Sequence, residues 1–258
     1  MPISVELAVE RLIDARSAHR MTAPLSEADP QLSLDQAYAI QDALRAALER
    51  QGERLLGWKV AATSPTARAA LGVGHPVAGF LLRSGLYGNG AEVPLNRFAN
   101  LVVEVEVAFR MRSALVGPGV TADSALLAVE GAFAALELAD FFLEGKPQIA
   151  DIVASDLYAN AIVLGSPLTP VRGLDLALEG VVYEQNGEIA ATNTAAEVMG
   201  NPLNSLVWLA NHLETRGLGL KPGDVVITGS ISKVLRPKAG DTVRGRFTRL
   251  GSVSAKFA

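Results

Sequence analysis

The 258-residue sequence contains no cysteine, and this excludes disulfides, thiolate nucleophiles and cysteine-based zinc sites together. Aromatic residues are also scarce, at 5% of the chain, whereas Ala, Leu, Val and Gly are abundant. Small side chains of this kind suit closely packed strands and helices. The lack of cysteine leaves the redox compartment undetermined, and none of these features by itself identifies a function.

Charge is low and evenly spread. Charged residues make up 19% of the chain, the formal net charge is -4, and Lys and Arg form no block. We therefore expect no surface that follows phosphates or anionic lipids, and no nucleic-acid or membrane partner. No uninterrupted apolar run approaches about 18 residues, and the N-terminus lacks a basic start followed by an apolar core. These absences predict a cytoplasmic protein.

Hydrophobic periodicity divides the chain in two. Apolar residues recur at helical spacing over residues 3–20. They do so again after Ser33, which precedes Gln36 by three as in a capping box, until Gly52. From Arg54 onward short strand-like runs dominate. The sequence thus predicts a helical N-terminal region over residues 1–53 and a β-rich main domain over residues 54–258.

Turn signals and alternation outline the main domain. Helices are expected from Ser64-Pro65, over residues 121–129 and after Asn201-Pro202, and Asn186-Gly187 suits a tight hairpin turn. Residues 72–100, rich in Gly, Pro and Asn, are expected to form loops and edge strands around a cleft. Two Gly-Asp turns near the C-terminus favour antiparallel pairing. The predicted strands are residues 55–60, 101–110, 132–139, 161–164, 225–228, 242–247 and 252–257.

Three glutamates stand out on these strands. Glu104 and Glu106 leave the same face of one strand, with Cα atoms about 6.6 Å apart, and can converge on one cation. A lone Glu-x-Glu more often marks a half-solvated strand with its polar residues outward. Glu137 interrupts an otherwise apolar strand, where an unpaired carboxylate is costly to bury. A metal ion would offset that cost, and a buried salt bridge to Arg or Lys is the weaker alternative.

The three carboxylates together would form a hard, oxygen-only site that prefers Mg²⁺ or Mn²⁺. An octahedral ion held in this way keeps open coordination positions. A 2-oxo acid can fill two of them with its carboxylate and carbonyl oxygens, so that the metal polarises the carbonyl and stabilises an enolate. The pattern therefore points to a metal-dependent enzyme that acts on a small 2-oxo acid or its enol.

Other candidate residues carry weaker signals. Lys59 is a cation in an apolar strand that neighbouring groups could tune as an acid, a base or a carboxylate clamp, although a lysine that reaches the surface is slightly favoured locally. The segment Thr228-Gly229-Ser230 ends a strand, and its hydroxyls and glycine backbone could hold a substrate carboxylate or simply form a turn. The scattered histidines are assigned no role. The sequence has no Gly-x-Ser-x-Gly elbow, P-loop or dinucleotide-binding glycine motif.

Taken together, the motifs resemble the 2-keto-4-pentenoate hydratase branch of the fumarylacetoacetate hydrolase superfamily, which includes 2-oxohept-4-ene-1,7-dioate hydratases and 4-oxalocrotonate decarboxylases. The similarity runs from about residue 30 to the C-terminus, and it rests on the order and spacing of seven segments. These are Gly57-Trp58-Lys59-Val60, Leu71-Gly72-Val73, Glu104-Val105-Glu106, Leu136-Glu137, Gly200-Asn201-Pro202-Leu203-Asn204, Gly223-Asp224-Val225-Val226-Ile227-Thr228-Gly229 and Leu250-Gly251-Ser252-Val253.

The resemblance implies an α+β fold with a fumarylacetoacetate hydrolase-like mixed β-roll core, a small helical N-terminal region, a catalytic domain over residues 54–258 and assembly into homo-oligomers. It implies that Glu104, Glu106 and Glu137 bind Mg²⁺ or Mn²⁺, and that Lys59 lies near the pyruvyl end of the substrate. The expected substrate-binding residues are Leu81, Thr228 and Gly229.

Two departures from the family pattern affect the expected chemistry. Hydratases of this branch usually carry an acid in a Pro-Asp-aromatic-Gly stretch, where this sequence has Val77. After the third metal ligand the family commonly has Ser-Arg, which Phe141-Phe142 replaces here, so a polar or charged substrate tail would lose its partner. Proton transfer then needs another group. The candidates are Lys59, Asp140, Asp156 and a metal-bound water, and the expected catalytic residues are Lys59 and Asp156.

The expected activity is that of a divalent-metal-dependent hydratase. It would add water to a 2-hydroxy-2,4-dienoate (2-oxo-4-enoate) to give a 4-hydroxy-2-oxo acid, as in aromatic meta-cleavage catabolism. The alternatives are a metal-dependent 2-oxo acid decarboxylase similar to 4-oxalocrotonate decarboxylase, or an acylpyruvate C–C hydrolase. A lesser alternative is a weakly active paralogue that supports a partner enzyme, and the retention of all three glutamates argues against it.

Overall fold

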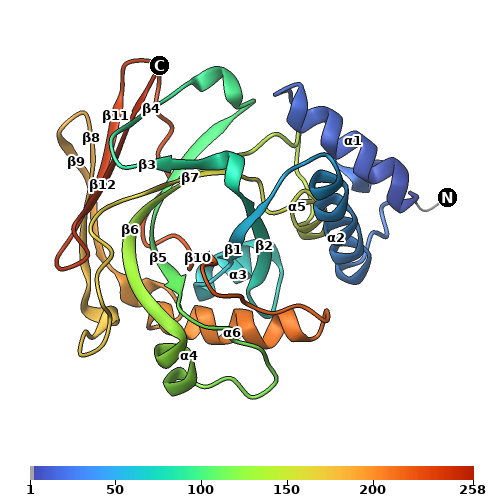
Figure 1. The fold of residues 1–258 in the computed structure, drawn as a ribbon. Helices are drawn as coiled ribbons and strands as arrows, with labels where there is room; N and C mark the ends of the chain where they lie inside the picture. Colours follow the sequence, from blue (N-terminus) through green and yellow to red (C-terminus); the bar gives the residue numbers. More distant parts are fainter. Residues whose placement is uncertain (1–2) are drawn as a thin grey trace.

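The computed structural model describes residues 3–258, and Figure 1 shows the strands on one side of the molecule and the N-terminal helices on the other. None of the helices in this part of the chain has both the length and the hydrophobicity needed to span a membrane. The helices are α1 (Val5–Ser17), α2 (Leu34–Arg50), α3 (Pro65–Leu71), α4 (Ala122–Ala128), α5 (Ile149–Ala154) and α6 (Pro202–Glu214). The strands are β1 (Leu55–Ala61), β2 (Val77–Leu82), β3 (Leu86–Gly88), β4 (Ala91–Val93), β5 (Leu101–Met111), β6 (Val129–Asp140), β7 (Ala159–Leu164), β8 (Gly180–Gln185), β9 (Glu188–Thr194), β10 (Val225–Ile227), β11 (Thr242–Phe247) and β12 (Ser252–Phe257).

Two curled sheets form the body of the protein (Figure 1). The seven-stranded sheet has the order β2-β1-β10-β5-β6-β7-β3, and the five-stranded sheet has the order β4-β12-β11-β8-β9. The long strands β5 and β6 pair in antiparallel fashion, with Leu101 opposite Asp140 at one end. The two sheets pack closely, because a Cβ atom on Gly245 of β11 would lie 2.7 Å from Cγ2 of Val105 on β5. A side chain at position 245 would therefore require Val105 to shift.

Most of the predicted elements are confirmed, with small shifts at their ends. The helices α1 and α2 occupy the predicted N-terminal segments, and Ser33 forms the expected capping box with Gln36. Helix α6 begins directly after Asn201, whose side chain accepts a hydrogen bond from the amide of Leu203. The predicted hairpin turn joins β8 to β9.

The segment 72–100 was expected to hold loops and edge strands, and its strands β2, β3 and β4 each lie at the edge of a sheet. Two features differ from the sequence-based expectation. Helix α5 was not predicted, because its six residues are too few to display a helical period. The antiparallel pairing predicted from the Gly-Asp turns is found for β11 with β12, but β10 lies parallel to β1 and antiparallel to β5.

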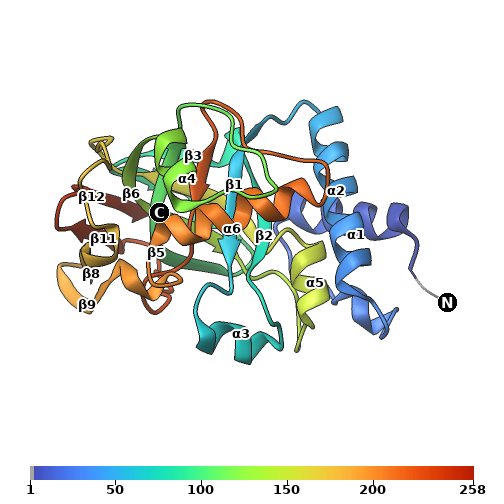
Figure 2. The same ribbon diagram turned by 90° about the horizontal axis from the view of Figure 1, so that it is seen from below.

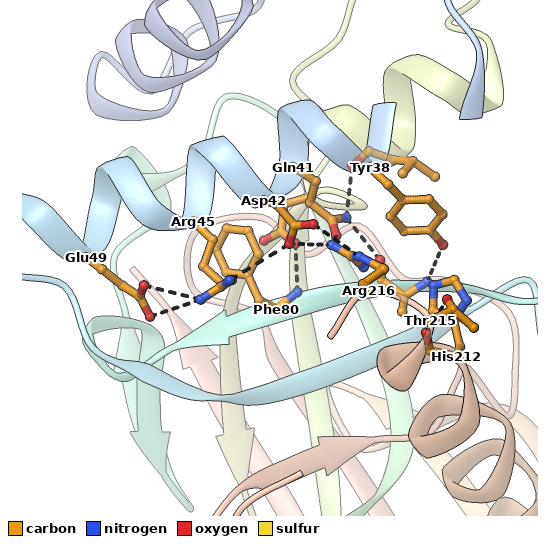
Figure 3. A network of polar contacts seen from close by, with 12 residues as sticks. Tyr38, Gln41, Asp42, Arg45, Glu49, Phe80, His212, Thr215 and Arg216 are labelled. Carbon is orange, nitrogen blue, oxygen red and sulfur yellow. Dashed lines mark hydrogen bonds and ion pairs between the residues drawn. The ribbon is translucent and has the colours of Figure 1, made fainter. Parts of the chain in front are cut away.

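Helix α2 is tied to the main body by buried polar contacts (Figure 3). Nε2 of the fully buried Gln41 donates to the carbonyl oxygens of Ala78 on β2, at 3.0 Å, and of Val153 on α5, at 2.9 Å. Arg216, just after α6, donates from Nη2 to Oδ1 of Asp42 on α2 at 2.6 Å. A buried amide with both of its N–H groups bonded fixes the segments that it contacts. Gln41 therefore holds β2 and α5 in place together.

A second buried contact holds α5 from the N-terminal side. The amide and hydroxyl of Ser26 donate to the two carboxylate oxygens of Asp151, at 2.7 and 2.6 Å. Helix α3 is different, because none of its residues is buried, and Figure 2 shows it projecting from the end of β1. Helix α5 is therefore held by buried hydrogen bonds, whereas α3 is exposed.

Candidate metal centre and substrate cavity

Strand register brings the three glutamates together. Glu104 on β5 lies directly opposite Glu137 on β6, and Glu106 follows two residues further along β5 on the same face. One carboxylate oxygen from each residue lies within 4.8 Å of those of the other two. The predicted cluster therefore forms in the structure, and its members come from neighbouring strands of one sheet.

Burial makes this cluster electrostatically unfavourable without a cation. Burial, together with the nearby carboxylate of Glu137, raises the pKa of Glu104 to about 7. Burial and the charges of Glu137 and Glu104 raise the pKa of Glu106 well above its usual range, although the amide of Gly229 donates to Glu106 Oε2 at 2.7 Å. A divalent cation would supply the missing positive charge to an all-oxygen donor set. The residues present fit Mg²⁺ or Mn²⁺.

Lys59 adds one positive charge to the cluster. It lies on β1, is 3% exposed, and its Nζ donates to Glu137 Oε1 and, at 3.0 Å, to the carbonyl oxygen of Leu157. Burial alone would lower the pKa of Lys59, but the charges of Glu137 and Glu104 outweigh burial and raise it. Lys59 is therefore a charged, buried lysine, and the local preference for a surface lysine was wrong. Glu137 therefore forms a salt bridge with Lys59 and also belongs to the carboxylate cluster. The single positive charge of Lys59 cannot neutralise three carboxylates.

A cavity of about 480 Å³ opens beside the cluster. Lys59, Glu104 and Glu137 line one end of it, and Glu106 supports them from outside the lining. Ser230, which follows Thr228 and Gly229 in the predicted strand-end segment, lines the cavity. Other polar side chains that the sequence had not singled out also line it, namely Thr63, Ser64, Asn193, Ser232 and the exposed Glu197 and Lys233. Single hydroxyl, amide and charged groups gave no pattern that could have marked them in the sequence.

Two predicted substrate-binding residues stand behind the cluster. Thr228 is fully buried, and its Oγ1 donates to the carbonyl oxygen of Val107 at 2.9 Å, so the hydroxyl already has a partner. Gly229 has a φ of 120°, and a Cβ atom there would lie 2.4 Å from Oγ1 of Thr63. Neither residue is part of the cavity lining. Gly229 acts on the site through its amide, which orients Glu106.

The remaining predicted residues lie outside the cavity lining. Leu81 packs with Leu56 in a separate core cluster. Asp140 accepts hydrogen bonds from the amides of Ala99 and Asn100, at 3.1 and 2.7 Å, so its carboxylate stabilises a turn.

Asp156 is fully buried, and its Oδ1 accepts from the amide of Phe80 at 2.7 Å. A Cβ atom on Gly79 would meet both Asp156 Oδ1, at 2.8 Å, and Lys59 Cγ, at 3.1 Å. Asp156 therefore lies beside the stem of Lys59 but does not reach the cavity.

Both departures from the family pattern lie at this site. Val77, the first residue of β2, is fully buried and lines the cavity, so a methyl-bearing wall stands where an acid was expected. Phe141 also lines the cavity, whereas Phe142 is 2% exposed and packs in the core. Only the first phenylalanine of the pair therefore faces the substrate space.

Comparison with known proteins decides the family. The fumarylacetoacetate (FAA) hydrolase C-terminal family model matches residues 59–258. The chain belongs to the fumarylacetoacetate hydrolase family. Within this fumarylacetoacetate hydrolase family, the chain is 34% identical over 255 residues to 2-keto-4-pentenoate hydratase from Paraburkholderia phymatum, covering 98% of this chain and 97% of the relative. It is 31% identical over 246 residues to 4-oxalocrotonate decarboxylase from Pseudomonas putida, covering 95% and 92%.

A solved fumarylacetoacetate hydrolase family structure has the same fold. It is 4-oxalocrotonate decarboxylase from Pseudomonas putida G7 complexed with magnesium and adipate, with a TM-score of 0.95, 28% sequence identity, and coverage of 98% of this chain and 97% of that one. The predicted family and fold are thereby confirmed. These full-length relatives are lyases, of which one is a hydratase and one a decarboxylase. The solved structure is a complex with magnesium.

Proposed function

We propose that the protein is a divalent-metal-dependent hydratase that adds water to a 2-hydroxy-2,4-dienoate (2-oxo-4-enoate) to give a 4-hydroxy-2-oxo acid. The observation that carries the proposal is the cluster of Glu104, Glu106 and Glu137, which lies beside Lys59 at one end of a cavity. Full-length relatives at 30–34% identity include several enzymes named hydratases, which favours hydration over other lyase reactions.

The glutamates and Lys59 have separate tasks in this proposal. Glu104, Glu106 and Glu137 hold Mg²⁺ or Mn²⁺, which when bound supplies the Lewis acid that polarises the 2-oxygen of the substrate. Lys59 Nζ carries three N–H donors, of which Glu137 and the Leu157 carbonyl use two. The third donor is free to bond the carboxylate or the 2-oxygen of the substrate, which places Lys59 at the pyruvyl end.

The cavity lining narrows the choice of proton-transfer group. The charged residues in the described lining are Lys59, Glu104, Glu137, Glu197 and Lys233. Glu197 and Lys233 are exposed, and Glu104 and Glu137 are needed for the metal. Lys59 is therefore the buried charged group that remains for proton transfer. We assign proton transfer at Nζ to Lys59, and we assign to Asp156 the positioning of the Lys59 stem from behind Gly79.

Turnover of 2-hydroxypenta-2,4-dienoate tests this function. The loss of ultraviolet absorbance and the mass of the product would be followed with Mg²⁺, with Mn²⁺ and after chelation. We expect a metal-dependent gain of one water. No reaction with this substrate, combined with metal-dependent cleavage or decarboxylation of other 2-oxo acids, would replace hydration by one of the alternatives.

Decarboxylation is the second candidate, because a full-length relative and the solved structure are both 4-oxalocrotonate decarboxylases. Release of CO₂ from a 2-oxo-enedioate without gain of water would favour it, and two organic fragments would favour an acylpyruvate hydrolase. Failure to turn over any 2-oxo acid despite tight metal binding would favour the weakly active paralogue.

We further propose that the protein is cytoplasmic and forms homo-oligomers, and that the site belongs to a catalytic domain over residues 54–258 to which the N-terminal region 1–53 is attached. Static light scattering on the purified protein tests assembly, and a monomeric mass would contradict it. Expression of residues 54–258 alone tests the division, because a separate domain would fold and bind metal without the N-terminal helices.

A further inference from the structure

We propose that the apolar part of the cavity lining selects substrates whose tail is uncharged, apolar and larger than a methyl group. The inference rests on the proposed function in one respect, namely that the 2-oxo acid head lies at the carboxylate cluster. It concerns a wall of the same cavity that contains no charged side chain within residues 3–258. We call this wall the apolar wall and define it as Val77, Ala139, Phe141, Ile149, Ile152 and Tyr158.

The apolar wall has a defined shape. Phe141 and Tyr158 stack with ring centroids 4.6 Å apart and an angle of 29° between their planes. Phe142 packs edge-on against the same Tyr158 ring from the core, at 6.0 Å and 87°. A ring held on two sides keeps its orientation. The wall therefore offers a fixed aromatic surface to the tail of a bound substrate.

The apolar wall is also held from behind by the N-terminal region. Gln41 bonds the carbonyls of Ala78, next to Val77, and of Val153, next to Ile152. These bonds join the parts of the wall that come from β2 and α5. The wall therefore cannot retreat to make room for water around a charged tail.

A charged tail would find no partner at this wall. In the part of the chain that the structure describes, the apolar wall has one polar side-chain group, the hydroxyl of Tyr158, and no ionised side chain. The guanidinium of Arg236 lies 5.8 Å from the centroid of the Phe141 ring, but it does not line the cavity and its Nη1 donates to Asn100 Oδ1 at 2.6 Å. A carboxylate placed against the wall would lose its hydration without gaining a buried opposite charge. Lys233 also lines the cavity, but it is exposed, and an exposed ion pair contributes little.

The cavity has room for more than the smallest dienoate. Its volume of about 480 Å³ lies within the range of about 300–1,000 Å³ that is typical of sites for drug-sized ligands, whereas 2-hydroxypenta-2,4-dienoate has eight non-hydrogen atoms. The apolar wall borders part of this space. An alkyl or aryl substituent fills it and removes apolar surface from water.

Binding of saturated 2-oxo acids tests the inference without turnover. Calorimetry on the Mg²⁺-loaded protein would compare 2-oxobutanoate, 2-oxooctanoate and 2-oxoheptanedioate, which share the head group. We expect 2-oxooctanoate to bind at least about tenfold tighter than 2-oxobutanoate, because four methylenes are buried. We expect 2-oxoheptanedioate to bind at least about tenfold more weakly than 2-oxooctanoate, because its second carboxylate is unpaired.

The ranking separates this inference from the proposed function. If the protein binds 2-oxooctanoate best but hydrates no dienoate, the apolar wall is as described and the hydratase proposal fails. If it hydrates 2-hydroxypenta-2,4-dienoate but binds 2-oxoheptanedioate as tightly as 2-oxooctanoate or more tightly, the inference about the tail is overturned and the hydratase proposal stands.

A pair of substitutions at one position locates the selectivity. Phe141→Arg introduces a cation into the apolar wall and should reverse the preference, so that 2-oxoheptanedioate binds tighter than 2-oxooctanoate. Phe141→Leu keeps the wall apolar and should preserve the wild-type order. Mn²⁺ affinity serves as the folding control, because neither substitution touches the glutamates. An unchanged ranking in a folded Phe141→Arg protein would overturn the assignment, and if this variant does not fold the wild-type ranking decides.

Discussion

At the carboxylate end of the cavity the side chains come from paired strands, with Glu104 opposite Glu137, whereas the apolar wall collects residues from β2, the end of β6, α5 and the turn after it. The first arrangement follows from strand register and needs few other contacts. The second depends on hydrogen bonds between residues that are more than a hundred positions apart in the sequence, namely Gln41 with Val153 and Asp151 with Ser26. Head-group chemistry is thus set locally, and tail selectivity is set by the packing of distant segments.

Lys59 is the contact between the two ends. Its Nζ donates to Glu137 in the carboxylate cluster and to the carbonyl oxygen of Leu157, which precedes Tyr158 of the apolar wall. A change at Lys59 should therefore disturb both ends, whereas changes at Glu106 or Gln41 should each disturb one.

The largest effect is expected from Glu106→Gln. The neutral amide keeps the shape of the side chain but removes one of three anionic ligands, so metal-dependent turnover should fall by about 10³-fold or more, which corresponds to about 4 kcal/mol. Steady-state kinetics and Mn²⁺ titration would measure the loss. The matched control is Glu130→Gln on the same β6 strand as Glu137, where Glu130 forms a half-exposed ion pair with Arg110. Equal losses in both variants would contradict the role of Glu106.

Lys59→Met should lower the free energy of unfolding by about 3 kcal/mol in the presence of a chelator, because it leaves buried carboxylates without their counter-charge. Saturating Mg²⁺ should reduce that loss, since the cation restores positive charge at the cluster. Urea unfolding under both conditions is the measurement. Lys256→Met, which breaks an exposed pair with Glu92, should cost at most about 1 kcal/mol in either condition. A loss at Lys59 that Mg²⁺ does not change would argue against a metal at this site.

Gln41→Leu should affect the apolar wall and not the carboxylate cluster. The carbonyls of Ala78 and Val153 lose their buried donor, and Nη2 of Arg216 loses its 3.1 Å hydrogen bond to Gln41 Oε1. The loss should cost about 1–3 kcal/mol of stability, while Mn²⁺ affinity should remain unchanged. Chemical denaturation and Mn²⁺ titration would be run side by side. Gln51→Leu, at the exposed end of the same helix, is the control and should have little effect. Loss of metal affinity in Gln41→Leu would show that the two ends are not independent.

The smallest effect is a pH dependence of the carboxylate end. Because burial raises the pKa of Glu104 to about 7, metal binding must displace a proton from this carboxyl below pH 7. The metal affinity should therefore fall by up to about tenfold for each pH unit below 7 and for each proton displaced. The sign is opposite for the chelated protein, whose stability should fall as pH rises from 4.5 to 7, because the folded state then binds more protons than the unfolded one. Mn²⁺ titrations between pH 6 and 8 measure the pH dependence of metal affinity. Chemical denaturation in the presence of a chelator measures the pH dependence of stability.

The sequence was most informative where a strict period applied. Alternation along a strand placed Glu104 and Glu106 on one face, and the interruption of an apolar strand marked Glu137; the structure brings all three together. The same reasoning could not tell that Lys59 is buried, because an apolar strand with one lysine is compatible with either face. Its partner Glu137 is 78 residues away.

The apolar wall could not be predicted in the same way. Strand β6 ends at Asp140, so alternation no longer decides whether Phe141 or Phe142 faces the cavity. Helix α5 is too short to show a period, and Tyr158 lies in a turn with a φ of 60°. Thr228 was expected to meet the substrate, but a strand-end hydroxyl can equally bond a neighbouring strand, and here it bonds Val107.

The pairing of Glu104 with Glu137 also bears on how the two longest strands find their register during folding. A slip of one residue between β5 and β6 would turn every side chain of one strand to the other face and separate the carboxylates. A cation that binds only the native alignment stabilises it by about 2.7 kcal/mol when its concentration is a hundred times the dissociation constant. Divalent cations should thus act as a thermodynamic selector of strand register as well as a cofactor.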